Sequence, residues 1–172
     1  MTFERLLLAD ARWSESLRRA ERPGALRVAA TVFAHSGDSW FWGLALAIVA
    51  WRGDAFWRSW AVHLVLSIAA LAVVVMAIKL LVRRRRPAGE WGAIYRNADP
   101  HSFPSGHAAR AALLAVLLAA WGPGWAAPIA IAWAPLVSLA RVALGVHYLS
   151  DVVAGAILGL VAAALTVTVF AP

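Results

Sequence analysis

Two runs of the sequence are long enough to cross a lipid bilayer and carry almost no charge. Residues 60–78 contain one ionisable side chain, His63, and residues 152–171 contain none. A helix rises about 1.5 Å per residue, so about 20 apolar residues span the roughly 30 Å of hydrocarbon in a bilayer. With 62% of its residues hydrophobic and 15% charged, the chain is too apolar for an ordinary soluble domain. We therefore expect a membrane protein.

Shorter apolar runs predict the rest of a membrane bundle. Residues 111–121 and 125–140 are uncharged, and the Gly-Pro-Gly between them is typical of a tight turn between antiparallel helices. Residues 39–51 are uncharged but short, and the apolar stretch 26–34 before them is either interfacial or the first part of a bent span. The predicted fold is all-α, a polytopic transmembrane helix bundle of about five spans, near residues 36–52, 57–81, 105–121, 125–144 and 147–170.

The first 24 residues form a separate unit in this prediction. Residues 2–21 place apolar side chains at helical spacing among arginines and acidic residues, which is typical of an amphipathic helix lying in the membrane interface. Pro23 and Gly24 end that helix. We therefore expect an amphipathic interfacial helix in residues 1–24 and a membrane-embedded domain in residues 25–172.

Basic residues outnumber acidic ones, and cysteine is absent. The formal net charge of +7 comes mainly from two blocks beside hydrophobic runs. Such blocks indicate an anionic lipid head group or the membrane surface as the partner, rather than nucleic acid. Without cysteine the chain has no disulfide, no thiol nucleophile and no thiolate metal site. The sequence leaves the oligomeric state open.

The predicted spans bring three polar clusters to one face of the membrane. The loop over residues 79–104 joins the second and third spans, and the joint near Gly145 links the fourth and fifth. Two crossings separate these connections, so both lie on the same side of the bilayer. Arginine-rich segments on that side favour the cytoplasm, but cations that bind a phosphate are poor evidence of topology. The sequence therefore leaves the side of the site open.

The first cluster is basic. Lys79 and Arg86 lie seven residues apart, which is two helical turns, and they share a face if the helix persists. Two fixed cations can hold a multiply charged oxyanion, and the arginine fork matches phosphate geometry. The alternative is a basic block beside the membrane that only sets the topology.

The second cluster, Pro-Ser-Gly-His at residues 104–107, precedes an apolar helix. Ser105 can cap this helix, so that the amides of Gly106 and His107 form an anion site at the positive end of its dipole. His107 then stands beside the anion, placed to give or take a proton. The alternative is a plain helix cap with an incidental histidine.

The third cluster runs from Arg141 to His147 and Asp151. His147 and Asp151 lie four residues apart and face each other if the segment is helical. The carboxylate would fix the imidazole tautomer and leave the other ring nitrogen as a nucleophile or base. Asp151 can instead simply stabilise a helix N-terminus, although an ionisable residue at the mouth of an apolar span is a functional candidate by default.

Together the three clusters resemble the type 2 phosphatidic acid phosphatase superfamily, which includes membrane lipid phosphatases and vanadium haloperoxidases. Its pattern is Lys-x6-Arg-Pro, Pro-Ser-Gly-His and Ser-Arg-x5-His-x3-Asp, matched here in order and spacing except that Ala140 replaces the serine before Arg141. The resemblance implies an integral membrane, metal-independent lipid phosphatase that uses no cofactor and forms a phosphohistidine. It assigns nucleophilic attack to His147, orientation of that ring to Asp151 and proton transfer to His107. The phosphate ligands it implies are Lys79, Arg86, Ser105, Gly106 and Arg141.

Basic residues outside this pattern are candidates for contacts with the rest of the substrate. We expect Arg110 and Arg83 to meet a second phosphate or an anionic head group, with Arg84 and Arg85 as further candidates. In the loop before the second motif, His101 and Arg96 are placed to close over the substrate.

Three functions are compatible with these residues. The leading hypothesis is a lipid phosphate or diphosphate phosphatase of the cell membrane, with a polyprenyl diphosphate, phosphatidylglycerophosphate, phosphatidate or a phosphorylated lipid A as substrate. The first alternative is a phosphatase for a soluble sugar phosphate. The second is a non-catalytic membrane protein whose basic face binds anionic lipid. Phosphate release from lipid and soluble substrates separates the three.

Overall fold

The computed structural model describes residues 3–89, 91 and 99–170, and this part of the chain is all-helical, as predicted. Apart from the helices, one isolated β-bridge pairs Arg85 with His101. The helices are α1 (Phe3–Leu17), α2 (Ala25–Ser36), α3 (Ser39–Arg52), α4 (Ala55–Val82), α6 (Gly106–Trp121), α7 (Ala126–Ala143) and α8 (Leu149–Val169).

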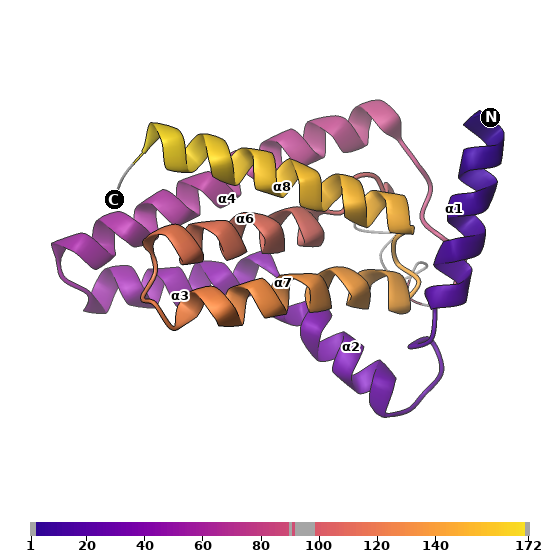
Figure 1. Cartoon of the computed structure of the whole chain (residues 1–172), viewed down its shortest axis with the longest axis horizontal. Coiled ribbons are helices and arrows are strands. Elements are labelled where there is room, and N and C mark those ends of the chain that lie inside the picture. Colours follow the sequence, from indigo (N-terminus) through magenta and orange to yellow (C-terminus); the bar gives the residue numbers. More distant parts are fainter. Residues whose placement is uncertain (1–2, 90, 92–98, 171–172) are drawn as a thin grey trace.

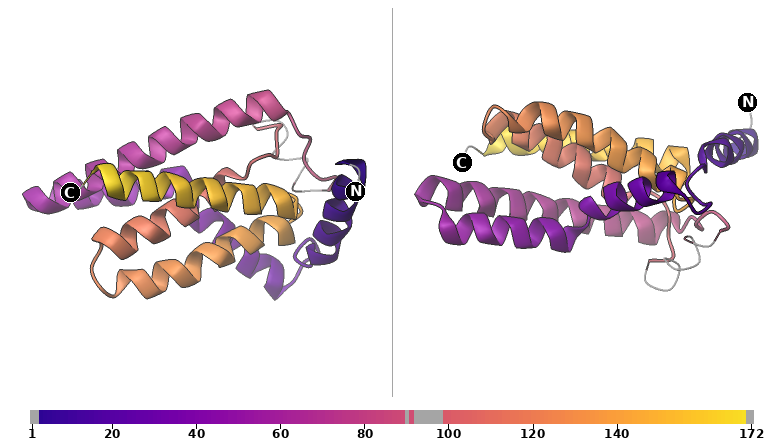
Figure 2. Two further views of the ribbon diagram at one scale, coloured as in Figure 1. Left: turned by 45° about the horizontal axis from the view of Figure 1, so that its top comes forward. Right: turned by 90° about the horizontal axis from the view of Figure 1, so that it is seen from below.

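Helices α3, α4, α6, α7 and α8 run along the long axis of the molecule (Figure 1). They form two layers, with α3 and α4 in one and α6, α7 and α8 in the other (Figure 2). α1 crosses one end of the bundle and packs against α7 and α8, while α2 lies obliquely against α7. The three polar clusters meet at the end that α1 crosses, as the parity of the predicted spans requires.

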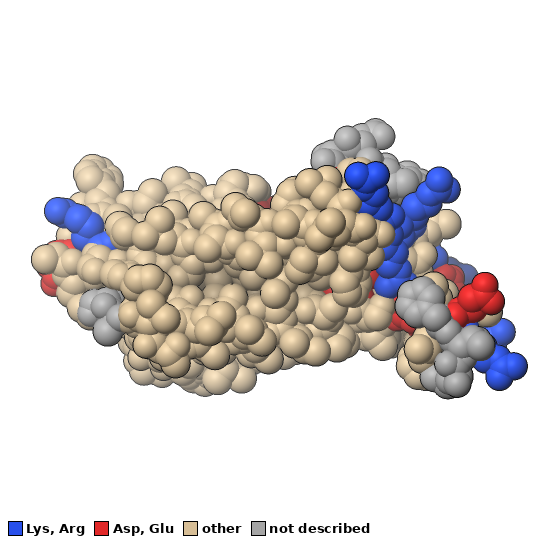
Figure 3. Space-filling view, turned by 90° about the horizontal axis from the view of Figure 1, so that it is seen from above, with Lys and Arg blue, Asp and Glu red and all other residues tan. Residues whose placement is uncertain are grey.

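Three helices in the described part are long and apolar enough to cross a membrane: α4, α7 and α8. α6 is apolar but has 16 residues, and α3 has 14. On the face shown in Figure 3, charged side chains gather at the two ends and the surface between them is almost entirely uncharged. Large apolar side chains are exposed along the long helices, such as Val73 (70%) on α4 and Leu165 (61%) on α8. A membrane protein explains this pattern, while the count of about five spans and the interfacial position of α1 stay predictions.

α2 and α3 meet at a bend near the start of the predicted first span. α2 ends at Ser36 and α3 begins at Ser39 in a different direction (Figure 1). Gly37 and Asp38 form the connection, and a Cβ on Gly37 would come within 2.9 Å of Val137 on α7. Because only a residue without a side chain fits that approach, the bend is pressed against α7 at the end of the bundle that carries the polar clusters.

Glycines on α8 let this helix pack closely against α6 beside the polar clusters. A Cβ on Gly155 would collide with the backbone oxygen of Ser105, and one on Gly159 with that of Ala109. Small residues of this kind let membrane helices approach each other backbone to backbone. At the same place the Ser105 amide donates to the backbone oxygen of Asp151 at 2.9 Å. The second and third clusters are therefore fixed relative to each other.

Candidate active site

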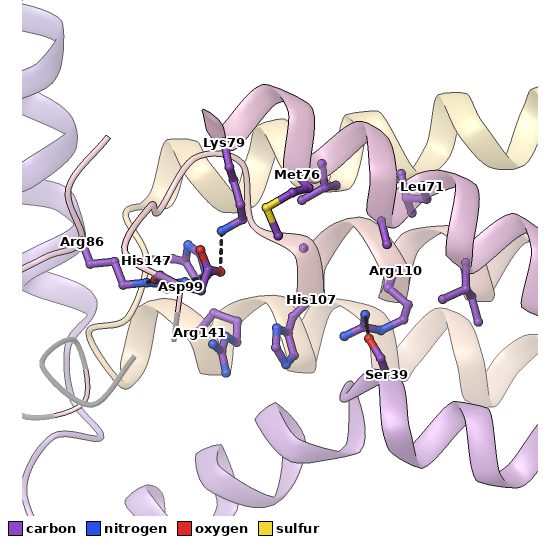
Figure 4. Close-up of a pocket in the computed structure, with 14 residues that line it drawn as sticks. Ser39, Leu71, Met76, Lys79, Arg86, Asp99, His107, Arg110, Arg141 and His147 are labelled. Atoms are coloured by element: carbon purple, nitrogen blue, oxygen red, sulfur yellow. Dashed lines mark hydrogen bonds and ion pairs between the residues drawn. The ribbon is translucent and has the colours of Figure 1, made fainter. Parts of the chain in front are cut away.

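A cavity of about 320 Å³ lies where the three clusters meet (Figure 4). Its wall on α4 is apolar and includes Leu71, Val75 and Met76. The opposite side is polar, and the predicted residues Ser105 and Asp151 are buried behind it. The polar lining consists of Ser39, Lys79, Arg86, Asp99, Gly106, His107, Arg110, Arg141 and His147. The cavity therefore offers cations and histidines beside an apolar surface.

Lys79 reaches this cavity from helix α4, and Arg86 reaches it from the non-helical segment that follows. α4 ends at Val82, and Arg83 then adopts a left-handed conformation with φ 51°. The helix does not continue to Arg86, so the two side chains do not share a helical face. They converge nevertheless, because each donates a hydrogen bond of 2.8 Å to Oδ2 of Asp99. The basic pair is thus assembled by the loop after α4 rather than by helical spacing.

Asp99 occupies the position in which the motifs predict a substrate phosphate. One oxygen accepts hydrogen bonds from two cations, as a phosphate oxygen would. Burial raises the pKa of this carboxyl, but the hydrogen bond from Lys79 and the charge of Arg86 outweigh burial and hold the pKa below its ordinary value. An internal carboxylate therefore neutralises the two cations.

His147 lies in the connection just before α8 begins at Leu149. Its Nε2 lies 3.2 Å from Nη1 of Arg86, and because a guanidinium has only donors, Nε2 must present its lone pair. Its Nδ1 faces Oδ2 of Asp151 at 3.6 Å, which is beyond hydrogen-bond distance. A neutral ring then carries its proton on Nδ1, which faces the carboxylate without a hydrogen bond, and the lone pair of Nε2 faces Arg86.

Asp151 is fully buried and held from both sides. Its Oδ2 accepts from the Tyr148 amide at 2.9 Å, and its Oδ1 accepts from Nη1 of Arg84 at 2.7 Å. Arg84 lies over the Tyr148 ring and also forms an ion pair of 2.7 Å with Asp10 of α1. This placement differs from the expectation that Arg84 meets a second phosphate, because two carboxylates already hold its guanidinium.

The start of α6 has the form that the sequence predicts. Ser105 is the N-cap, and its hydroxyl accepts from the Ala108 amide at 3.4 Å. Gly106 lines the cavity, so its backbone is open to a ligand there. Nε2 of His107 lies 2.7 Å from Oδ1 of Asp38, in the connection between α2 and α3. The sequence did not indicate this last contact.

The basic residues outside the motifs take different positions. Arg110 lines the cavity, but its guanidinium donates to the backbone oxygen of Gly37 and to Oγ of Ser39. Arg83 is exposed and lines a second cavity of about 540 Å³. The other residues around that cavity are Arg85, Arg86, Pro100 and His101. Arg96, which was expected to close over the substrate, lies outside the described residues.

Comparison with known proteins gives the family. Residues 60–172 match the sequence model of the PAP2 superfamily, and this segment contains all three motifs. The chain belongs to the PAP2 superfamily. It is a lipid phosphatase of the PAP2 type, and the resemblance drawn from the motifs is confirmed.

Relatives of this PAP2 protein include named phosphatases and solved structures. The decaprenylphosphoryl-5-phosphoribose phosphatase of Mycobacterium tuberculosis (strain CDC 1551 / Oshkosh) is 37% identical over 143 residues, which cover 81% of this chain and 77% of the relative. A transmembrane PAP2-type phosphatidylglycerolphosphate phosphatase from Bacillus subtilis aligns with a TM-score of 0.75 and 26% identity, over 95% of this chain and 85% of that one. Aquifex aeolicus LpxE aligns with a TM-score of 0.71 and 26% identity, over 90% and 93% of the two chains.

Three carboxylates around the PAP2 motifs could not be assigned from the sequence. Asp38 lies 69 residues from His107, and Asp99 lies 20 residues from Lys79. Asp10 on α1 lies 74 residues from its partner Arg84. Spacing rules apply within one element and say nothing about such pairs. One signal was present, since all three are acidic residues in segments that the parity of the spans places on the face of the site.

Proposed function

We propose that this PAP2 phosphatase hydrolyses the phosphomonoester of a lipid in the cell membrane through a phosphohistidine on His147. The observation that carries the proposal is that Lys79 and Arg86 bind one oxygen of Asp99 beside Nε2 of His147. A phosphoryl group in place of that carboxylate would contact two cations and face an imidazole lone pair. The apolar wall on α4 gives the lipid chain a surface next to its head group.

In the first step, the lone pair on Nε2 of His147 attacks phosphorus. A P–N bond forms and the bond from phosphorus to the ester oxygen breaks. His107 donates a proton to the departing oxygen, so that the lipid leaves as an alcohol. Asp151 stabilises the positive charge that the His147 ring gains. The charge on the phosphoryl oxygens is offset by Lys79, Arg86, Ser105, the Gly106 amide and Arg141.

In the second step, water attacks the phosphorus of the phosphohistidine. His107, now neutral, accepts a proton from that water while the P–N bond breaks. The electron pair of that bond returns to Nε2 of His147, and inorganic phosphate leaves. His107 is again protonated for the next ester, so both steps are balanced without a metal or a cofactor.

Among lipid phosphates we favour a polyprenyl-linked sugar phosphate. The name of the mycobacterial relative, decaprenylphosphoryl-5-phosphoribose phosphatase, specifies two phosphates on one substrate. The cavity beside Arg83 shares Arg86 with the active-site cavity, and its arginines suit a second phosphate. A second candidate substrate is phosphatidylglycerophosphate, because the likeness to the Bacillus subtilis enzyme covers 95% of this chain.

A substrate panel tests the proposal. Purified protein in lipid is given a polyprenylphosphoryl pentose 5-phosphate, phosphatidylglycerophosphate or ribose 5-phosphate, and phosphate release is measured. We expect the highest kcat/KM for the polyprenyl substrate and inhibition by orthovanadate. His147→Ala should abolish release, whereas Glu4→Gln on α1 serves as the unchanged control. Equal hydrolysis of ribose 5-phosphate would favour a soluble substrate, and lipid binding without release would favour the non-catalytic alternative.

Two further measurements test the chemistry. The described part of the chain has no group of three or more His, Asp or Glu side chains arranged to hold a metal ion. We expect activity to persist in excess chelator; its loss, with restoration by a divalent metal, would contradict the mechanism.

In His107→Ala supplied with an aryl phosphate, the first step should proceed and the second stall. Acid-labile, base-stable phosphate should then accumulate on His147, and labelled phosphate on another residue would refute the assignment.

A further inference from the structure

The connection between α2 and α3 makes hydrogen bonds with the first turns of α6 at the edge of the active-site cavity. His107 contacts Oδ1 of Asp38 at 2.7 Å. Arg110, one turn further along α6, donates to the backbone oxygen of Gly37 and at 2.5 Å to Oγ of Ser39. Residues 37–39 are therefore joined by several hydrogen bonds to the helix that carries the proposed acid–base group. They also lie ahead of the segment 60–172 that carries the family motifs.

The carboxylate of Asp38 is held in place from several directions. Its Oδ2 lies 2.9 Å from Nδ1 of His35 and accepts from Nε1 of Trp40 at 3.2 Å. The side chains of Asp38 and His107 are each 17% exposed. A partly buried carboxylate with these donors is ionised, since each donated hydrogen bond favours its charged form.

This contact decides which nitrogen of His107 serves the reaction. An ionised carboxylate only accepts hydrogen bonds, so Nε2 of His107 must carry a proton toward Asp38. Nδ1 is then the nitrogen left for chemistry, as an acid when protonated and as a base when not. The carboxylate also stabilises the imidazolium, against the positive charges of Arg110 on the same helix and Arg141 on α7. Asp38 would thus orient His107 and stabilise its charged form, as Asp151 is proposed to do for His147.

We infer that Asp38 is a positioning residue for the proton transfers of His107, a role that rests on the proposed phosphatase mechanism. It fixes Nδ1 as the nitrogen that protonates the leaving oxygen and later activates water. The site then contains two histidine–carboxylate pairs, one for the nucleophile and one for the acid–base group. The second pair depends on the bend between α2 and α3.

The test compares two leaving groups in Asp38→Asn. An alkyl ester needs protonation as it leaves and an aryl ester needs little, so a lost acid slows the first far more. We expect kcat for the lipid alkyl phosphate to fall about 10²-fold with little change in KM. For an aryl phosphate, formation of the phosphohistidine should be nearly unchanged. The alkaline limb of the kcat profile for the alkyl ester should move to lower pH, because the imidazolium has lost its anion.

Trp40→Phe is the matched control, because it removes another hydrogen bond to the same carboxylate and leaves the contact with His107. It should keep the leaving-group preference and the pH profile of the parent enzyme. Asp38→Glu retains the charge, so the alkaline limb should stay in place while kcat for the alkyl ester falls about tenfold. This variant tests the inference if Asp38→Asn does not fold. Thermal unfolding in detergent shows which variants are folded.

The outcomes separate this inference from the proposed function. If folded Asp38→Asn slows phosphohistidine formation from alkyl and aryl esters equally and leaves the pH profile unmoved, Asp38 does not act through His107 and the inference is overturned. Equal slowing of phosphohistidine formation from both esters in folded Asp38→Glu would overturn it as well. If the parent enzyme releases no phosphate from lipids, the lipid assignment fails. The comparison is then made with soluble alkyl and aryl phosphates, so the role of Asp38 is still decided. Greater loss on the alkyl ester supports it in either case.

Discussion

Two carboxylates of the site differ in how easily a substrate can replace them. The side chain of Asp99 is 34% exposed and bridges Lys79 and Arg86, whereas that of Asp151 is fully buried behind His147. We expect a substrate phosphate to take the place of Asp99, whereas Asp151 is buried out of its reach. Removing the charge of Asp99 should therefore strengthen anion binding, whereas removing the charge of Asp151 should lower kcat.

Asp99→Asn should strengthen anion binding. The neutral amide competes less well for Lys79 and Arg86, because hydrogen bonds between ionised groups are stronger than those to a neutral acceptor. We expect orthovanadate to inhibit about tenfold more tightly, which corresponds to about 1.4 kcal/mol, with a lower KM and little change in kcat. Asp54→Asn, at the N-cap of α4 at the other end of the bundle, is the control. Weaker vanadate inhibition would show that Asp99 organises the cations for the substrate instead of competing with it.

Asp151→Asn should reduce kcat and leave KM nearly unchanged. An asparagine keeps the shape but cannot stabilise the positive charge on His147 or hold its proton on Nδ1. By analogy with the aspartate of the serine-protease triad, a loss of about 10⁴ is the upper expectation. Steady-state kinetics on the lipid substrate measures it. A loss below tenfold would mean that the 3.6 Å separation of His147 and Asp151 persists during the reaction.

At the scale of elements, α1 is joined to the bundle by polar contacts with the start of α8. Oδ1 of Asp10 accepts from the Ser150 amide at 3.0 Å, and Oγ of Ser14 accepts from the Leu149 amide at 2.8 Å. These bonds satisfy amides that the first turn of a helix leaves unpaired. Asp10 also binds Arg84, which holds Asp151. α1 therefore caps the helix that carries Asp151.

Asp10→Asn should affect both stability and turnover. Losing a cap of this kind costs about 1 kcal/mol in the free energy of unfolding. Arg84 would also lose one of its two carboxylates and shift its position on Asp151, so we expect kcat to fall about tenfold with KM nearly constant. Glu4→Gln, an exposed substitution on the same helix, should change neither. If Asp10→Asn lowers only the unfolding temperature, α1 is an anchor without influence on the site.

The helices and motifs could be predicted from the sequence, but several of their junctions could not. Apolar runs and the glycine turn before Trp125 mark the helices because each signal is local. The end of α4 at Val82 and the docking of α1 through Asp10 depend on partners in other elements. The same limit hid Asp38 and Asp99, whose partners are distant in sequence. Helices and the cap at Ser105 were therefore predictable, whereas the shared helical face expected for Lys79 and Arg86 was wrong and contacts between distant segments could not be predicted.

At the scale of the molecule, the polar residues divide between two ends. The active-site end carries α1 and the clusters around Lys79 and His147, and the turn between α6 and α7 lies at the opposite end (Figure 1). Between them the surface on the face of Figure 3 is almost entirely uncharged. We therefore expect the protein to lie across the bilayer with its two ends in different compartments. The side on which the phosphate is released follows from that orientation.

The orientation can be measured because the chain has no native cysteine. Single cysteines are introduced at Glu90, which follows α4 in the sequence and lies outside the described residues, and at Gly124, where a side chain meets no atom within 4 Å. An impermeant thiol reagent applied to intact cells should label one of the two, and permeabilised cells should show both. A cysteine at Ile157, which is 56% exposed in the middle of α8, should remain unlabelled because lipid covers it. Labelling of Glu90 and Gly124 together in intact cells would refute the spanning arrangement; otherwise the labelled position identifies the compartment that the active site faces.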